Sequence, residues 1–113
     1  MPFINTKTTA KIDKEKEIAI KEEFGKAIEL IRGKSERWLM LNFEDSCSMY
    51  FNGTDEDCAI MEVKIFGKAS EEEYASLTAK LTEIICKYLP IPPTRVYVKY
   101  EEIFNWGYNG VNF

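Results

Sequence analysis

A chain of 113 residues that is 45% hydrophobic fits one domain with a modest core. The formal net charge of −4 and the lack of a basic run argue against a nucleic-acid partner, because clustered Lys and Arg supply most affinity for phosphate. The three cysteines are far apart and lack ligand spacing, so we expect no zinc site and no disulfide framework. No cofactor is expected either. No apolar run is long enough to span a bilayer, which makes a cytoplasmic, reduced protein without membrane insertion the default expectation.

The chain begins "MPFINTKT", and Pro2 opens a segment typical of a strand over residues 2–8. Proline is tolerated at the first residue of a strand, where the missing donor costs nothing. Alternatively, removal of the initiator Met would turn Pro2 into a free secondary amine, a candidate base or nucleophile. The chain has no His, so chemistry near pH 7 needs another group, and the α-amine, with an ordinary pKa of about 7.7 to 8, is one. This stretch alone leaves both interpretations open.

Residues 13–32 have the pattern of an amphipathic helix. Asp13 is a plausible N-cap and Gly33 is placed as the C-terminal stop. The residues of the apolar face follow one another at helical spacing, namely Ile20, Phe24, Ala27 and Ile31. The segment "RWLMLNFED" that follows reads as a strand over residues 37–45.

A second helix is predicted over residues 71–88, between strand-like segments at 59–66 and 95–102. Ser70 and Glu73 form a capping-box pattern at its start, and Pro90 stops it. Its apolar face comprises Tyr74, Leu77, Leu81, Ile84 and Tyr88.

The elements form two β-α-β units offset by about fifty-eight residues, which suggests pseudo-repeats at about 1–57 and 58–113 within a single domain, 1–113. Two right-handed crossovers predict an α/β fold with a four-stranded mixed sheet and both helices on one face. The strands "RWLMLNF" and "AIMEVKIF" are apolar on nearly every residue, the pattern of strands covered on both sides. With only two helices available, another subunit is the simplest cover for the opposite face.

Five segments carry a resemblance to a known family: "MPFI", "GKSERWLMLNF", "MYFNGTDEDCAIMEVKIFGK", "PTRVYVKYEE" and "NWGYNGVNF". In order and spacing they resemble the macrophage migration inhibitory factor family of the tautomerase superfamily, from end to end. The resemblance implies a homotrimer in which three sheets form a barrel surrounded by helices, with active sites between neighbouring subunits. It also implies an isomerase activity, the keto-enol tautomerisation of small-molecule α-keto acids such as phenylpyruvate.

The same resemblance assigns roles to individual residues. Pro2, after loss of Met1, would be the catalytic base, and Lys34 would bind the substrate carboxylate, with the backbone amide of Phe66 as a second donor. The alternative for Lys34 is a solvated lysine that favours the dipole at a helix C-terminus. Tyr97 would enter the site from the adjacent subunit, or else is an ordinary strand aromatic between subunits.

Five further aromatic residues are expected either as core or as a pocket around a phenyl ring: Phe3, Trp38, Trp106, Tyr108 and Phe113. The family usually has its tryptophan at the position of Tyr108, so the pocket shape is expected to differ. Met61 stands where some members have the second Cys of a Cys-x-x-Cys motif, so thiol-disulfide activity is not expected.

Lys99 replaces an asparagine found in many family members and shares a strand face with Tyr97. It would favour substrates with an extra anionic group, or else pairs with Glu101 or Glu102 at the surface. A different functional class also remains open, because family members act as cytokine-like signalling proteins that engage cell-surface receptors. No signal peptide is present, so secretion would follow an unconventional route.

Overall fold

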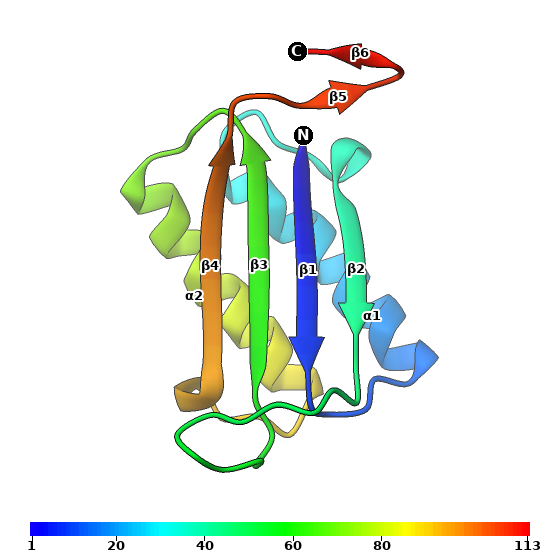
Figure 1. The fold of residues 1–113 in the computed structure, drawn as a ribbon, viewed down its shortest axis with the longest axis vertical. Coiled ribbons are helices and arrows are strands. Elements are labelled where there is room, and N and C mark those ends of the chain that lie inside the picture. Colours follow the sequence, from blue (N-terminus) through cyan, green and yellow to red (C-terminus); the bar gives the residue numbers. More distant parts are fainter.

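Strand β1 (Pro2–Thr8) lies in the middle of a four-stranded sheet in the computed structural model, which describes residues 1–113 (Figure 1). The sheet order is β2-β1-β3-β4, with β2 at Met40–Glu44, β3 at Ala59–Phe66 and β4 at Val96–Ile103. The outer pairs β1/β2 and β3/β4 are parallel, whereas the central pair β1/β3 is antiparallel. The predicted mixed sheet is confirmed, and the origin of the two β-α-β units by duplication stays a prediction.

Both helices cover the same face of the sheet (Figure 1). Helix α1 (Lys14–Ala27) begins after Asp13, whose carboxylate accepts the Lys16 N–H at 2.9 Å, and α2 (Glu71–Tyr88) begins at the predicted capping box of Ser70 and Glu73. No helix in the chain is both long and apolar enough to cross a membrane.

Two boundaries differ from the sequence prediction. Helix α1 ends at Ala27 and tightens into a 3₁₀ turn over Ile28–Leu30, because bonds between residues three apart often close the last turn of a helix. The expected strand at 37–45 begins only at Met40, because Glu36–Trp38 forms another 3₁₀ turn. Gly33 lies between the two turns with φ of 82°, as expected of a helix stop.

The core lies between the sheet and the helices. Alternate residues of β1 and β3, including Ile4, Met61 and Val63, are fully or almost fully buried there. Phe24 of α1 is completely buried and stacks on Phe43 of β2 with 6.2 Å between ring centroids. Burial of this apolar surface holds the helices on the sheet, since each Å² removed from water contributes roughly 25 cal/mol.

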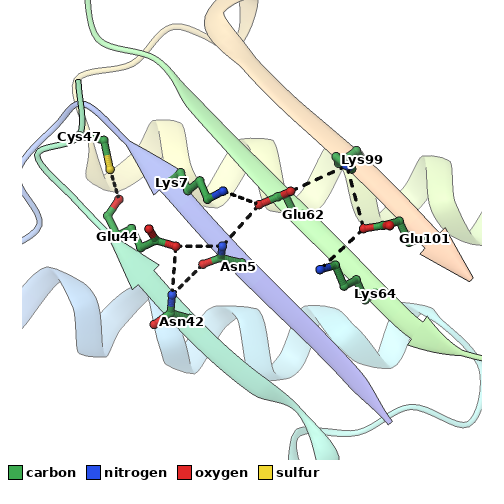
Figure 2. Close-up of polar contacts among 9 residues, drawn as sticks. All are labelled: Asn5, Lys7, Asn42, Glu44, Cys47, Glu62, Lys64, Lys99 and Glu101. Atoms are coloured by element: carbon green, nitrogen blue, oxygen red, sulfur yellow. Dashed lines mark hydrogen bonds and ion pairs between the residues drawn. The ribbon is translucent and has the colours of Figure 1, made fainter. Parts of the chain in front are cut away.

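The opposite face of the sheet is open in the single chain, and its centre is polar (Figure 2). Within one chain, β2 and β3 alternate between more and less exposed residues, because the helices cover only one face, and cover of the other face by a second subunit stays a prediction. Glu62 contacts the Lys7 ammonium at 3.2 Å and the Lys99 ammonium at 3.8 Å. The polar side chains of this open sheet face are Asn5, Lys7, Asn42, Glu44, Glu62, Lys64, Lys99 and Glu101.

Candidate functional site

The N-terminus is fixed at the end of the central strand pair. Pro2 lies opposite Ile65 in the β1/β3 register, and the Phe66 N–H donates to the Met1 carbonyl at 3.0 Å. Pro2 itself is buried, with its side chain on the helix side of the sheet. The first residues of the chain are therefore held by the last residues of β3.

Lys34 reaches the same place by way of α1. The helix has 14 residues and spans about 21 Å, close to the roughly 23 Å of the seven-residue strand β1, so α1 returns the chain to the end where β1 begins. Gly33 turns the backbone there, and the Lys34 ammonium donates to the Phe66 carbonyl at 2.9 Å. The backbone of Phe66 thus binds both residues: its N–H donates to Met1, and its carbonyl accepts from Lys34.

The electrostatics of this cluster act on the terminal amine. Burial of the Met1 α-amine disfavours its charged form, and the nearby Lys34 ammonium disfavours it further, so its pKa is lowered from 8.0 to about 6. An amine with this pKa is mostly neutral at pH 7. The cluster can therefore supply an uncharged base next to a fixed cation.

The last residues of the chain bring aromatic rings to this end of the sheet. A hairpin of β5 (Gly107–Tyr108) and β6 (Val111–Asn112) lies beyond the start of β1 (Figure 1). Tyr108 meets Trp38 edge-on with 5.2 Å between centroids, and Phe113 lies against Phe66 at 6.0 Å. The half-buried Trp106 accepts the Phe113 N–H through its carbonyl at 2.8 Å. Four of the aromatic residues singled out from the sequence thus gather at this end.

Phe3 lies on the other side of β1, on the open sheet face. The Lys64 ammonium is 5.9 Å from the centre of its ring, within the range of a cation–π contact. Phe3 is opposite Lys64 in the β1/β3 register. Within one chain it faces the polar network rather than the core.

Tyr97 and Lys99 lie well away from the N-terminus of their own chain. Tyr97 is opposite Ile60, five residues along β3 from the partner of Pro2, which corresponds to about 16 Å. Its side chain is 59% exposed and meets the Phe51 ring edge-on at 4.9 Å. A single chain therefore cannot bring Tyr97 to Pro2.

Lys99 is paired on the open sheet face, as one of the two sequence-based alternatives expected. Its ammonium lies 3.8 Å from Glu62 and 4.0 Å from Glu101. Tyr97 and Lys99 do share one face of β4. A role for Lys99 toward substrate stays a prediction.

The sequence analysis gave no role to Arg95, which is almost buried at the start of β4 and binds four backbone carbonyls. The only available signal was an arginine at the beginning of a strand-like segment, directly after a proline-rich turn. The largest surface hollow is elsewhere, between the end of α1 and the start of α2, and its lining is polar apart from Leu30. We therefore place the candidate site at the N-terminal cluster, which we define as Met1, Pro2, Lys34 and Phe66. There the Lys34 ammonium lies at the same end of the sheet as the aromatic rings of the C-terminal hairpin (Figure 1).

Comparisons with known proteins agree with one another. The family model described as macrophage migration inhibitory factor (MIF) matches residues 1–113. The macrophage migration inhibitory factor of Xenopus laevis is 30% identical over 83 residues, 72% of each chain. The crystal structure of Leishmania major MIF2 has a TM-score of 0.94 at 28% identity and covers 100% of this chain and 97% of that chain. The homologue from Prochlorococcus marinus has a TM-score of 0.88 at 26% identity and covers 98% of both chains.

Proposed function

Because the chain belongs to the macrophage migration inhibitory factor family, we propose that it is a tautomerase of phenylpyruvate-like α-keto acids that uses Pro2 as its base after loss of Met1. One observation carries the proposal. The Met1 α-amine lies partly buried beside Lys34, and these surroundings lower its pKa to about 6. Removal of Met1 makes the Pro2 nitrogen the terminal amine, one residue further into the same surroundings.

The reaction needs a base whose pKa lies near the working pH. A more basic amine would be mostly protonated, and a less basic one would not remove the proton. The neutral Pro2 nitrogen takes a proton from the carbon next to the keto group, the electron pair moves onto the keto oxygen, and the Pro2 ammonium returns the proton to that oxygen, directly or through water, to give the enol. The reverse sequence converts enol into keto acid, and no proton is gained or lost overall.

Lys34 and Phe66 would hold the substrate. The Lys34 ammonium offers a fixed positive charge for the carboxylate, and loss of Met1 frees the Phe66 N–H from its bond to the Met1 carbonyl. That donor is then available to a substrate oxygen. Loss of Lys34 should therefore impair binding and turnover together, because the bound substrate and the transition state both carry this carboxylate charge.

The pocket would be completed by assembly. Because Tyr97 is displaced by about 16 Å along the sheet from the N-terminus of its own chain, it can serve only the site of a neighbouring subunit. A homotrimer formed through the open sheet faces would provide that neighbour. The rings of Trp38, Tyr108 and Phe113 would then enclose the phenyl group and lower the local dielectric, which strengthens the contact with Lys34.

The first test is phenylpyruvate tautomerisation, followed by ultraviolet absorbance, with the intact mass of each preparation recorded. In Met1-free protein we expect Pro2→Gly to lower kcat/KM by orders of magnitude, because glycine leaves a primary amine without the pyrrolidine ring. Pro90→Ala, which changes an exposed proline remote from the cluster, is the matched control and should retain activity.

Inactive Met1-free wild type would contradict the catalytic proposal for this substrate. The second candidate, a cytokine-like protein released by an unconventional route to bind a cell-surface receptor, would then take precedence. It is supported by family membership alone.

A further inference from the structure

One side chain holds the loop that precedes β3. Arg95 is 9% exposed and ends the 3₁₀ turn Pro93–Arg95. Its guanidinium donates to four backbone carbonyls at 2.8 to 3.3 Å, those of Phe51, Thr54, Glu56 and Asp57. We call this set of contacts the Arg95 clamp.

The clamp depends on the shape of arginine. A guanidinium has five donors in a planar fork, and here three of its nitrogens reach carbonyls spread over residues 51–57. None of the ion pairs in the chain involves Arg95, so its charge is stabilised by carbonyl dipoles and by the Phe51 ring. Lysine, with one compact ammonium, could not span the same set of acceptors.

The loop inside the clamp is a tight turn. Phe51 and Thr54 exchange backbone hydrogen bonds of 2.9 and 3.1 Å. Asn52 and Gly53 between them have φ of 53° and 75°, the left-handed conformations that such a two-residue turn requires. The position of the Phe51 side chain is consequently fixed by both the turn and the clamp.

Phe51 connects the clamp to Tyr97. The Arg95 guanidinium lies 5.2 Å from the centre of the Phe51 ring, and the same ring packs edge-on against Tyr97 with 4.9 Å between centroids. A tyrosine that is 59% exposed on a strand would otherwise have several side-chain rotamers open to it. The packed Phe51 ring restricts that choice.

We propose that Arg95 is a positioning residue for catalysis, acting through Phe51 on the direction in which Tyr97 projects into the site of the neighbouring subunit. The proposal rests on the proposed function, because it requires Tyr97 to contact substrate there. Positioning of this kind matters because a misplacement of about 1 Å can cost about 100-fold in rate.

A double-mutant cycle tests the coupling between these residues. We expect Arg95→Lys and Phe51→Leu each to lower kcat/KM for phenylpyruvate about tenfold in protein of unchanged oligomeric state. In a Tyr97→Ala background, neither change should lower it further, because the residue they position is absent. The pH dependence of kcat/KM should keep its midpoint, since the N-terminal cluster is untouched. Lys21→Met, an exposed charge on α1, is the control and should resemble wild type.

A second measurement reads the clamp independently of activity. Ring protons of Tyr97 sense the ring current of Phe51, so Arg95→Lys should shift their NMR resonances in the same direction as Phe51→Leu. Two results would overturn the positioning role: Tyr97 resonances that do not shift in Arg95→Lys, or a further fall in kcat/KM when Arg95→Lys or Phe51→Leu is added to Tyr97→Ala. Inactive wild type would instead overturn the proposed function. If Arg95→Lys fails to fold, the same readouts on Phe51→Leu decide.

Discussion

Lys34 directs its hydrogen bond and its charge at different groups. The hydrogen bond goes to the Phe66 carbonyl at 2.9 Å, which fixes the position of the ammonium, and the charge acts on the terminal amine beside it. A lysine held only by solvent would spread its charge over many rotamers. At this position the cation is in place before a substrate arrives, so little reorganisation is required on binding.

The Met1-retaining protein allows this electrostatic effect to be measured. We predict that Lys34→Met raises the pKa of the Met1 α-amine from about 6 part of the way toward 8.0, because burial, the larger cause, remains. The rate of α-amine acylation, followed by mass spectrometry as a function of pH, gives this pKa. Lys21→Met is the control, and an unchanged midpoint in Lys34→Met would mean that Lys34 has no influence on the amine.

Individual residue roles were only partly accessible from the sequence. Pro2 and Lys34 were singled out through the family resemblance, but a separation of 32 positions says nothing by itself about distance. Their proximity results from the matched lengths of β1 and α1. The bond from Lys34 to the Phe66 carbonyl and the clamp by Arg95 involve backbone acceptors, which carry no sequence signal.

At the scale of elements, the sequence predicted the starts of both helices well, because side chains that cap a helix are of few residue types. The bounds of β1, β3 and α2 agree with the prediction, and the side chains of Asp13 and Ser70 make the expected capping bonds. The end of α1 was predicted too late because buried Ile28 and Ile31 continue the apolar pattern through a 3₁₀ turn. Apolar spacing reports burial, and it does not distinguish the last α-helical turn from a tighter one.

The capping box gives a prediction for α2. Ser70→Ala removes the acceptor for the Glu73 N–H, so we expect the free energy of unfolding to fall by about 1 kcal/mol in chemical denaturation. Ser76→Ala, on an exposed position of the same helix, is the matched control. It should leave stability unchanged or slightly increase it, since alanine has the higher helix propensity. Equal effects of the two substitutions would contradict a specific capping role.

At the scale of the whole molecule, the open sheet face carries a balanced charge network. Glu62 contacts two lysines, and the Lys7 ammonium in particular lowers the pKa of the Glu62 carboxyl below its ordinary value of 4.5. Most residues of β2 and β3 are apolar, a pattern that predicts strands covered on both faces. The alternate positions of β3 differ, because Glu62 and Lys64 share the side away from the helices.

The proposed assembly through this face should therefore weaken in acid. A lowered pKa means that the stabilisation from Glu62 is fully present above about pH 4.5 and is lost as the pH falls through the lowered value. Protonation leaves the charges of Lys7 and Lys99 uncompensated.

We predict that the mass measured by light scattering drops toward that of the single chain on acidification. Glu62→Gln should show weaker assembly already at neutral pH. A Glu62→Gln assembly as stable as wild type would contradict this role.

The two parts of the proposed site lie at opposite ends of one sheet: the N-terminal amine with Lys34 at one end, and Tyr97 with the Arg95 clamp at the other. In the proposed assembly, a chain with a Pro2 substitution still provides an intact Tyr97 to its neighbour. A chain with a Tyr97 substitution still has an intact N-terminal amine. A mixed trimer of two such inactive chains would contain one complete site. Activity would then depend on the interface between two chains, although each chain is encoded separately.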